Sequence, residues 1–364
     1  MGIFGSKPKS ILGIDIGTSS IKVVQLRKSE GKFKLETYGE ISTLGYIERL
    51  NESFQSSSLK TLEAITREMI RLVIEKSGAD AKNVVMAIPV FSSFTSVIEM
   101  PEMAEKELNR AVEFEARKYI PIPLSEVVLD WKIVDSGTIK DENSKIIQGK
   151  RVLLIAVPKE VVNKYIRISD SLNLKINALE LESFSFARSL TLSGDEKPIC
   201  VLDIGARATS FTIIDKNTVQ MSHGLDIAGA EMTRILASSL GVAFKRAEDF
   251  KLAHGINHSN SEATVDKKET KEALITLIDE ILTESERMIN NYYFKTNRKI
   301  EKLILNGGSA QMEGLKEYAE KRLNIKTFIA DPWTKVAYLP GLEKILKEIG
   351  SEFSVAVGAA MREE

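Results

Sequence analysis

The chain has 364 residues, more than one ordinary hydrophobic core accommodates, so we expect two lobes. Its formal net charge is -1 and it contains no long basic run, so no nucleic-acid partner is predicted. The single cysteine, Cys200, excludes an internal disulfide and fits a reducing compartment. Because it precedes an apolar run, we interpret it as a buried strand residue. No apolar stretch approaches the ~20 residues that a membrane-spanning helix needs.

An internal repeat divides the chain into two halves. Residues 11–26 read ILGIDIGTSSIKVVQL, and residues 199–214 read ICVLDIGARATSFTII. Each segment is an apolar strand that ends in Asp-Ile-Gly, followed by a small polar turn and a second strand. The repeat predicts that each half opens with the same hairpin.

The hairpins have the features of phosphate-binding loops. Gly17 and Gly205 have no Cβ, so a phosphate can approach the turn backbone, whose amides can form an anion-binding nest. Asp15 and Asp203 stand at the strand ends, where carboxylates can hold the waters around Mg²⁺. The alternative is a pair of plain hairpins with glycine turns. The repetition of Asp-Ile-Gly at the start of both halves argues against it.

The two turns supply most of the candidate phosphate-binding residues. They are Gly17, Thr18, Ser19, Ser20 and Lys22 in the first copy, and Gly205, Ala206, Arg207, Ala208 and Thr209 in the second. Hydroxyls and the Arg207 guanidinium are natural donors to phosphate, whereas strand alternation leaves the direction of Lys22 open. The sequence carries neither a Walker loop nor a G-x-G-x-x-G fingerprint.

The rest of the chain mixes strands with crossover helices, which predicts an α/β protein. In the first half we expect strands over 32–41, 84–89, 93–100 and 151–157, and helices over 59–76, 102–119 and 159–172. In the second half we expect helices over 230–240, 243–254 and 271–295, a polar excursion over 257–268, and a short C-terminal helix over 353–361.

A third motif follows the long helix. Residues 303–315 read LILNGGSAQMEGL, a strand that meets a Gly-Gly turn. Gly307 and Gly308 lack side chains, so a flat base and ribose could lie against them. Ser309 is placed to cap the next helix.

In this order the motifs resemble those of the actin, Hsp70 and sugar-kinase superfamily. The hairpins are similar to its two phosphate motifs, and residues 303–315 to its adenosine motif. Residues 178–190 and 356–360 resemble its two connecting helices. The resemblance implies an actin-like two-lobed fold of duplicated RNase H-like domains, with ATP and Mg²⁺ as ligands. It also places Glu180 near the attacking water, as a catalytic residue.

Within the superfamily, residues 110–131 resemble the PilM family, actin-like proteins of type IV pilus assembly related to the division protein FtsA. The segment reads RAVEFEARKYIPIPLSEVVLDW. Gly229 also fits, as do Glu248 and Lys251, a pair that lies near the adenosine in relatives. The alternative for this pair is a solvated helix face. Asn306 departs from the pattern, because relatives commonly have a third glycine there.

The resemblance also implies a division into subdomains. The first-lobe core would comprise residues 1–83 and 173–198, with an extra partner-binding subdomain inserted over 84–172. The second-lobe core would comprise residues 199–224 and 300–364, with a smaller subdomain over 225–299.

The function implied by the resemblance is that of a cytoplasmic ATP-binding scaffold. It would bind the N-terminal cytoplasmic tail of the inner-membrane protein PilN in a groove of the first half, and relatives also engage pilus motor ATPases. Candidate apolar contacts are Phe91, Phe94, Tyr119 and Ile122, although core packing is the simpler role for each. Because no FtsA-type amphipathic helix follows residue 361, we expect the protein at the inner face of the inner membrane only through partners.

Two other functions stay compatible with the sequence. A small-molecule kinase would need a substrate pocket, and no motif marks one. The sequence is compatible with slow ATP hydrolysis, but it does not predict rapid turnover. A filament former like MreB or FtsA would self-associate through surfaces that the sequence does not reveal. The three histidines show no metal-binding spacing.

Overall fold

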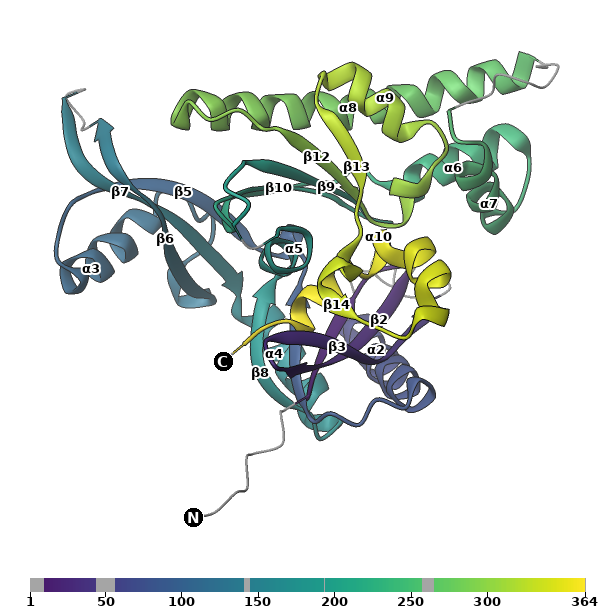
Figure 1. The fold of residues 1–364 in the computed structure, drawn as a ribbon, viewed down its shortest axis with the longest axis horizontal. Helices are drawn as coiled ribbons and strands as arrows, with labels where there is room; N and C mark the ends of the chain where they lie inside the picture. Colours follow the sequence, from purple (N-terminus) through teal and green to yellow (C-terminus); the bar gives the residue numbers. More distant parts are fainter. Residues whose placement is uncertain (1–9, 44–55, 141–144, 193, 257–264, 364) are drawn as a thin grey trace.

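The computed structural model describes residues 10–43, 56–140, 145–192, 194–256 and 265–363. Within these ranges the strands form three sheets, of six, five and three strands. Two sheets form the cores of two lobes stacked one above the other, and the third projects to one side (Figure 1). Of the polar excursion expected over 257–268, residues 257–264 lie outside the described residues. Residues 265–268 belong to a helix.

The first sheet contains the first hairpin and has the order β14-β3-β2-β1-β4-β8. The strands are β1 (Ser10–Ile16), β2 (Ser20–Ser29), β3 (Lys32–Ser42), β4 (Asn83–Ile88), β8 (Lys175–Leu181) and β14 (Val336–Ala337). β1 to β3 form an antiparallel meander, whereas β4 and β8 run parallel to β1. Helices α2 (Ser56–Ser77) and α4 (Lys159–Ser171) contact this lobe.

The second sheet repeats this arrangement with the order β11-β10-β9-β12-β13. Its strands are β9 (Ile199–Ile204), β10 (Thr209–Asp215), β11 (Thr218–Leu225), β12 (Lys302–Asn306) and β13 (Lys326–Ile329). The two hairpins therefore open equivalent sheets, as the repeat predicts. Cys200 is fully buried on β9, and burial raises the pKa of its thiol to about 12.

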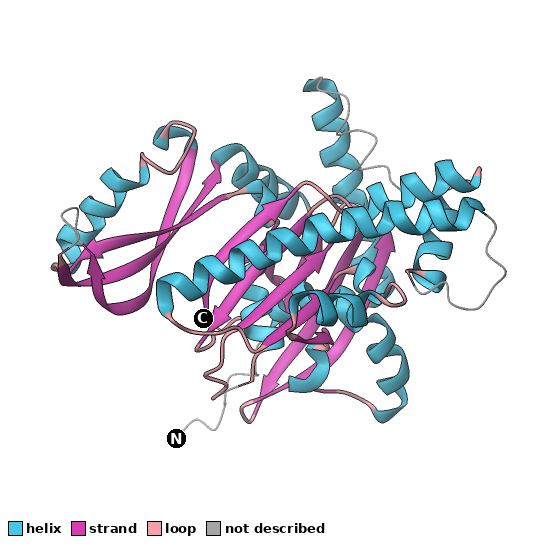
Figure 2. Ribbon diagram, turned by 90° about the horizontal axis from the view of Figure 1, so that it is seen from above, coloured by secondary structure: helices cyan, strands magenta, loops and turns pink. Residues whose placement is uncertain are grey.

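Helices pack on or beside the second sheet. They are α6 (Gly229–Leu240), α7 (Phe244–His254), α8 (Val265–Thr296) and α9 (Leu315–Leu323). α8 and α9 contact its strands, α6 packs on α8, and α7 packs on α6. Figure 2 shows α8 lying across the strands. Its apolar side chains, including Leu274, Ile278 and Ile281, belong to the core of this lobe. In the described residues, no helix combines the length and the apolarity needed to cross a membrane.

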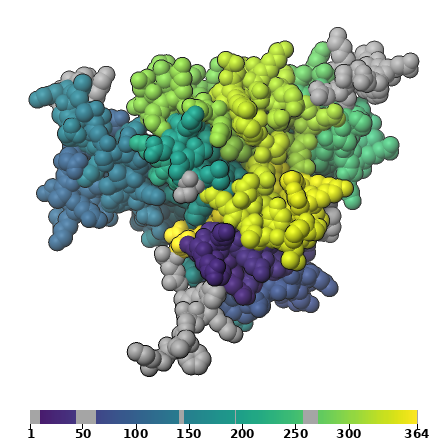
Figure 3. Space-filling view, in the orientation of Figure 1, coloured from purple at the N-terminus to yellow at the C-terminus, as the bar shows by residue number. Residues whose placement is uncertain are grey.

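The third sheet is an insertion in the first half. β5 (Phe94–Pro101), β7 (Ile146–Pro158) and β6 (Val127–Lys140) pair in that order, and α3 (Glu105–Ala116) packs on them through Leu108 and Val112. This inserted subdomain protrudes from the body of the molecule (Figure 3).

The insertion is shorter than the expected range of 84–172. β4 pairs with β1 and β8, so residues 83–88 belong to the first lobe. Tyr165 and Ile168 of α4 pack in the same core. β14, expected in the second lobe, pairs with β3 of the first sheet. Sheet pairing and core contacts, which the local sequence does not display, set these limits.

Two helices cross between the lobes. α5 (Glu182–Leu190) and α10 (Glu343–Ala360) contact each other, and α10 also contacts β1 and β2. A Cβ on Gly358 would lie 2.0 Å from the carbonyl oxygen of Ser185, so only glycine allows this approach. α10 is twice the length of the expected C-terminal helix, because its first half packs on Trp333 and Val336 of the preceding segment.

Candidate functional site

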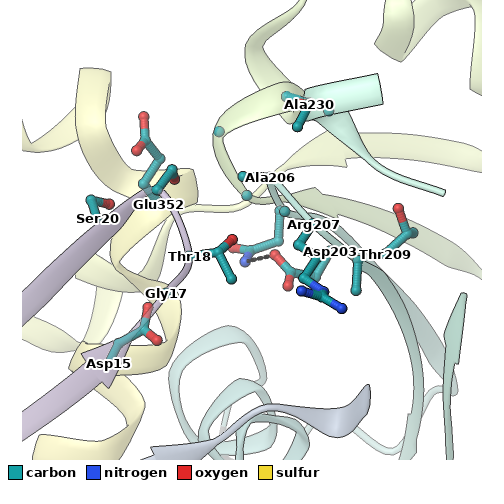
Figure 4. Close-up of a pocket in the computed structure, with 18 of the residues that line it drawn as sticks. Asp15, Gly17, Thr18, Ser20, Asp203, Ala206, Arg207, Thr209, Ala230 and Glu352 are labelled. Carbon is teal, nitrogen blue, oxygen red and sulfur yellow. Dashed lines mark hydrogen bonds between the residues drawn. The ribbon is translucent and has the colours of Figure 1, made fainter. Parts of the chain in front are cut away.

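A cavity of about 380 Å³ lies between the two hairpins. Figure 4 shows Asp15 and Gly17 of the first hairpin on one side of it, facing Asp203 and Ala206 of the second. Every residue predicted to bind ATP or Mg²⁺ lines this cavity. These are Asp15, Gly17, Thr18, Ser19, Ser20, Lys22, Asp203, Gly205, Ala206, Arg207, Ala208, Thr209, Gly229, Glu248, Lys251, Gly307, Gly308 and Ser309.

The second turn is joined to the start of α6 by backbone hydrogen bonds. The amide of Gly229 donates to the carbonyl of Gly205 at 3.0 Å, and that of Ala230 donates to Ala206 at 2.9 Å. A Cβ on Gly229 would lie 2.2 Å from the Ser309 hydroxyl oxygen. This glycine therefore lets the phosphate turn, α6 and the Gly-Gly turn meet at one point.

Three carboxyl groups face the phosphate end of the cavity: that of Asp15 is buried, and those of Asp203 and Glu182 are partly buried. Burial raises the pKa of Asp15 to about 6, with Lys22 opposing the shift and Asp203 adding to it. Burial likewise raises the pKa of Asp203 to about 6, although the Asn306 hydrogen bond opposes it. Burial and the two aspartates raise the pKa of Glu182 well above its ordinary value. The mutual repulsion indicates a site that is incomplete without a cation.

Lys22 points toward this cavity, which settles the direction that the sequence left open. Its ammonium lies 3.2 Å from Glu40 and 3.7 Å from Glu352, and it donates a hydrogen bond to Ser20. Burial lowers the pKa of Lys22, but Glu40, Asp15 and Glu352 more than compensate and raise it above the ordinary value. A permanent positive charge thus stands at the phosphate end.

The part of the cavity next to the start of α6 is built around a second buried lysine. Lys251 is 1% exposed and lies 2.9 Å from a carboxylate oxygen of Glu248. It also donates to the Gly229 carbonyl at 3.1 Å and to the Thr233 hydroxyl at 3.0 Å. Burial lowers the pKa of Lys251, and Glu248 opposes the shift. The pair is therefore part of the cavity wall and not a solvated helix face.

A family comparison relates this geometry to known proteins. The family model for type IV pilus assembly protein PilM matches residues 13–364. The chain belongs to the PilM family. Among curated proteins, it is 22% identical to the cell division protein FtsA of Enterococcus faecalis over 89% of this chain and 79% of that protein.

Solved structures with the same fold are also known. A PilM-PilN type IV pilus biogenesis complex superposes with a TM-score of 0.74 at 23% identity, over 97% of this chain and 98% of that chain. MreB5 of Spiroplasma citri, bound to AMPPNP, gives 0.52 at 12% identity, over 96% and 94%. These likenesses confirm the predicted actin-like two-lobed fold.

Glu180 does not line the cavity, contrary to expectation. Its carboxylate forms ion pairs with Arg188 of α5 and with Arg362, at 2.6 Å for the latter, and accepts a hydrogen bond from Ser185. Glu182, two residues later at the start of α5, occupies the cleft instead. Glu180 therefore joins β8 to the crossing helices, whereas the carboxyl group of Glu182 lines the cleft.

The two ion pairs of Glu180 should stabilise the fold without affecting nucleotide binding. Glu180→Ala is expected to lower the free energy of unfolding by on the order of 2 kcal/mol, because it leaves Arg188 and Arg362 without their shared partner. Its ATP affinity should stay close to that of the unmodified protein. Glu182→Gln should leave the unfolding free energy unreduced. Denaturant titration and ATP titration of both variants check this, and equal destabilisation by the two would contradict it.

Other cleft residues were not identified from the sequence. Glu40, Glu352, Phe91 and Phe244 all line the cavity. The alternation of β3 could have found Glu40, which pairs in register with Lys22. Glu352 and Phe244 carry no local signal, since long-range packing alone brings α10 and α7 to the cleft.

Proposed function

We propose that this chain is an ATP- and Mg²⁺-binding scaffold of type IV pilus assembly, which binds the N-terminal tail of PilN and responds to nucleotide by closing its cleft. The observation that carries the proposal is the convergence of both hairpins, α6, α7 and the Gly-Gly turn on one cavity. Membership of the PilM family supports the assignment to pilus assembly.

The residues present fit the nucleotide and the metal. Lys22, the turn amides and the hydroxyls of Thr18 and Ser19 offer donors for phosphate oxygens. Asp15 and Asp203 offer carboxylates on facing sides of the cavity. Mg²⁺ bound with a nucleotide keeps several waters and takes other ligands from phosphates. Within the described ranges, no group of three or more His, Cys, Asp or Glu side chains is arranged to hold a metal ion.

Contacts of the inserted subdomain offer a route from nucleotide to partner. Phe91 lines the cavity, and its backbone packs against Gly224 of β11. A Cβ added to Gly224 would lie 3.4 Å from the Cα of Phe91. Thr95 of β5 donates to the Ser222 carbonyl at 2.7 Å. The inserted subdomain thus touches the second lobe beside the cleft, so cleft closure would shift its position.

The similarity to the PilM-PilN complex supports a PilN tail as the partner. Of the four apolar contacts expected from the sequence, Phe94 and Ile122 pack on the core of the inserted subdomain. Phe91 and Tyr119 keep 44% and 46% of their surface exposed. Tyr119 is therefore the better candidate for direct contact with the PilN tail. Phe91 is the better candidate for transmitting cleft closure to the inserted subdomain.

The experiment that tests the proposal is calorimetric titration with Mg-ATP, followed by a synthetic peptide of the PilN tail. Binding of both, with each ligand changing the affinity for the other, is the expected result. Binding of ATP without the peptide would leave a division, filament or kinase role in its place. Absence of ATP binding would refute the proposal.

Phe91→Ala is expected to reduce the coupling between the two ligands. Peptide affinity without ATP should change little, because Phe91 does not contact the peptide in this proposal. The effect of ATP on peptide affinity, of the order of fivefold for a typical allosteric coupling, should be largely lost. Phe114→Ala is the matched control, because Phe114 is 67% exposed on α3 and does not line the cavity. Undiminished coupling in Phe91→Ala would exclude this route.

A further inference from the structure

A row of three polar side chains crosses the second sheet at the cleft. In the strand register, Asp203 of β9 pairs with Ser210 of β10 on one side and with Asn306 of β12 on the other. Residues paired in register project from the same face of a sheet. All three line the cavity, so the row Ser210–Asp203–Asn306 forms one continuous polar edge.

The orientation of the Asn306 amide is fixed by chemistry. Its Nδ2 donates to Asp203 Oδ1 at 2.7 Å. An ionised carboxylate only accepts hydrogen bonds, so the nitrogen and not the oxygen of the amide must face Asp203. Asn306 therefore holds the Asp203 carboxylate in one orientation, and its own Oδ1 must find a donor elsewhere.

Both neighbours of Asp203 have an oxygen without a partner. Asn306 is 3% exposed and Ser210 is 6% exposed. Asn306 Oδ1 and Ser210 Oγ make no hydrogen bond with any described residue. Buried polar atoms normally have partners, and two unpaired oxygens beside one carboxylate indicate that a ligand supplies the donors.

We propose that the row Ser210–Asp203–Asn306 receives the water shell of a hydrated divalent cation, Mg²⁺ under the proposed function, on which this inference rests. Waters bound to a cation are strong donors and need acceptors around them. Asp203, Asn306 Oδ1 and Ser210 Oγ provide acceptors along one line, opposite Asp15. Asn306 additionally positions Asp203, so the polar residue in this turn serves cation binding.

Two serines provide a matched pair of variants for the test. Ser210 and Ser354 are both buried and both have an unpartnered Oγ among the described residues, but Ser354 on α10 does not line the cavity. Ser210→Ala, Ser354→Ala and Asn306→Ala are titrated with Mg²⁺ at saturating ATP, and with ATP in a chelator. Thermal unfolding verifies that each variant is folded.

The expected result is a selective loss of Mg²⁺ dependence. Asn306→Ala should raise the Mg²⁺ concentration for half-saturation about tenfold and Ser210→Ala several-fold, the usual scale for a charge-assisted hydrogen bond. Ser354→Ala should change neither titration, and in the chelator the ATP affinity of the other two variants should fall by much less than their Mg²⁺ dependence. If Ser210→Ala and Asn306→Ala titrate like Ser354→Ala, the inference is overturned while the proposed function stands. Failure of the unmodified protein to bind ATP would refute both.

Discussion

Asp203→Asn is expected to remove the Mg²⁺-dependent part of ATP binding and, at the same time, to stabilise the protein without ligands. The carboxylate faces the carboxyl groups of Asp15 and Glu182, whose pKa values are raised first by burial and further by its charge. Burial raises the pKa of Asp203 itself. An amide in its place leaves no charge to bury, ends the repulsion and can still accept the hydrogen bond from Asn306. A shift of about two pKa units corresponds to roughly 3 kcal/mol, so a gain on the order of 1–3 kcal/mol is expected.

Stability without ligands should also depend on pH. Because the pKa of Asp15 and that of Asp203 are raised from 3.8 to about 6 on folding, the folded protein binds more protons than the unfolded chain between these values. Stability without ligands should therefore fall as the pH rises from about 4 to 6, and the pair should remain unfavourable above it. Mg²⁺ should reverse this loss at neutral pH, since it binds the ionised form.

The control for this prediction lies in the same sheet. Asp215 at the end of β10 is also buried, but it is paired with Arg298 at 2.6 Å and accepts a hydrogen bond from Tyr292. Asp215→Asn should therefore lower the unfolding temperature and leave ATP binding intact. Thermal unfolding with and without Mg-ATP measures both variants. A lowered unfolding temperature in Asp203→Asn would show that the three carboxyl groups do not repel one another as inferred.

The parts of the site that the sequence predicts are those encoded locally. Both hairpins and the Gly-Gly turn are short continuous segments whose glycines, hydroxyls and aspartates act within a few residues of one another. The error at Glu180 has a different origin. Glu180 aligns with Asp15 through Ala87 in the register of β1, β4 and β8. Two strand spacings separate them, about 10 Å, and the Glu180 carboxylate is paired with Arg188 and Arg362 instead.

Long-range packing explains what else the sequence does not reveal. The limits of the inserted subdomain depend on which strands pair and which core α4 joins, and neither is written in local periodicity. Asn306 departs from the glycine-rich pattern of the turn, and the local sequence gives no reason for it. The reason is a partner on the neighbouring strand. The Asn306 amide faces Asp203, a residue 103 positions earlier in the chain.

Gly358→Ala is expected to lower the free energy of unfolding substantially. The added Cβ would lie 2.0 Å from the Ser185 carbonyl oxygen and 2.6 Å from its carbonyl carbon, both backbone atoms of α5. The two helices would have to separate. Overpacking of this kind costs about 3 kcal/mol, against which alanine regains about 1 kcal/mol of helix propensity. A net loss of about 2 kcal/mol of unfolding free energy is expected.

The crossing also positions cleft residues, so nucleotide binding should weaken together with stability. α5 begins with Glu182 and α10 carries Glu352, both lining the cavity. Gly350→Ala is the matched control in α10, because its nearest neighbour, the Ala330 carbonyl oxygen, would lie 3.3 Å away. That variant should stay within about 1 kcal/mol of the unmodified protein. Denaturant unfolding and Mg-ATP titration separate the two glycines. Equal unfolding free energies and ATP affinities in the two variants would mean that α5 and α10 can separate without loss of stability. The close contact of the two helices would then not position the residues of the cleft.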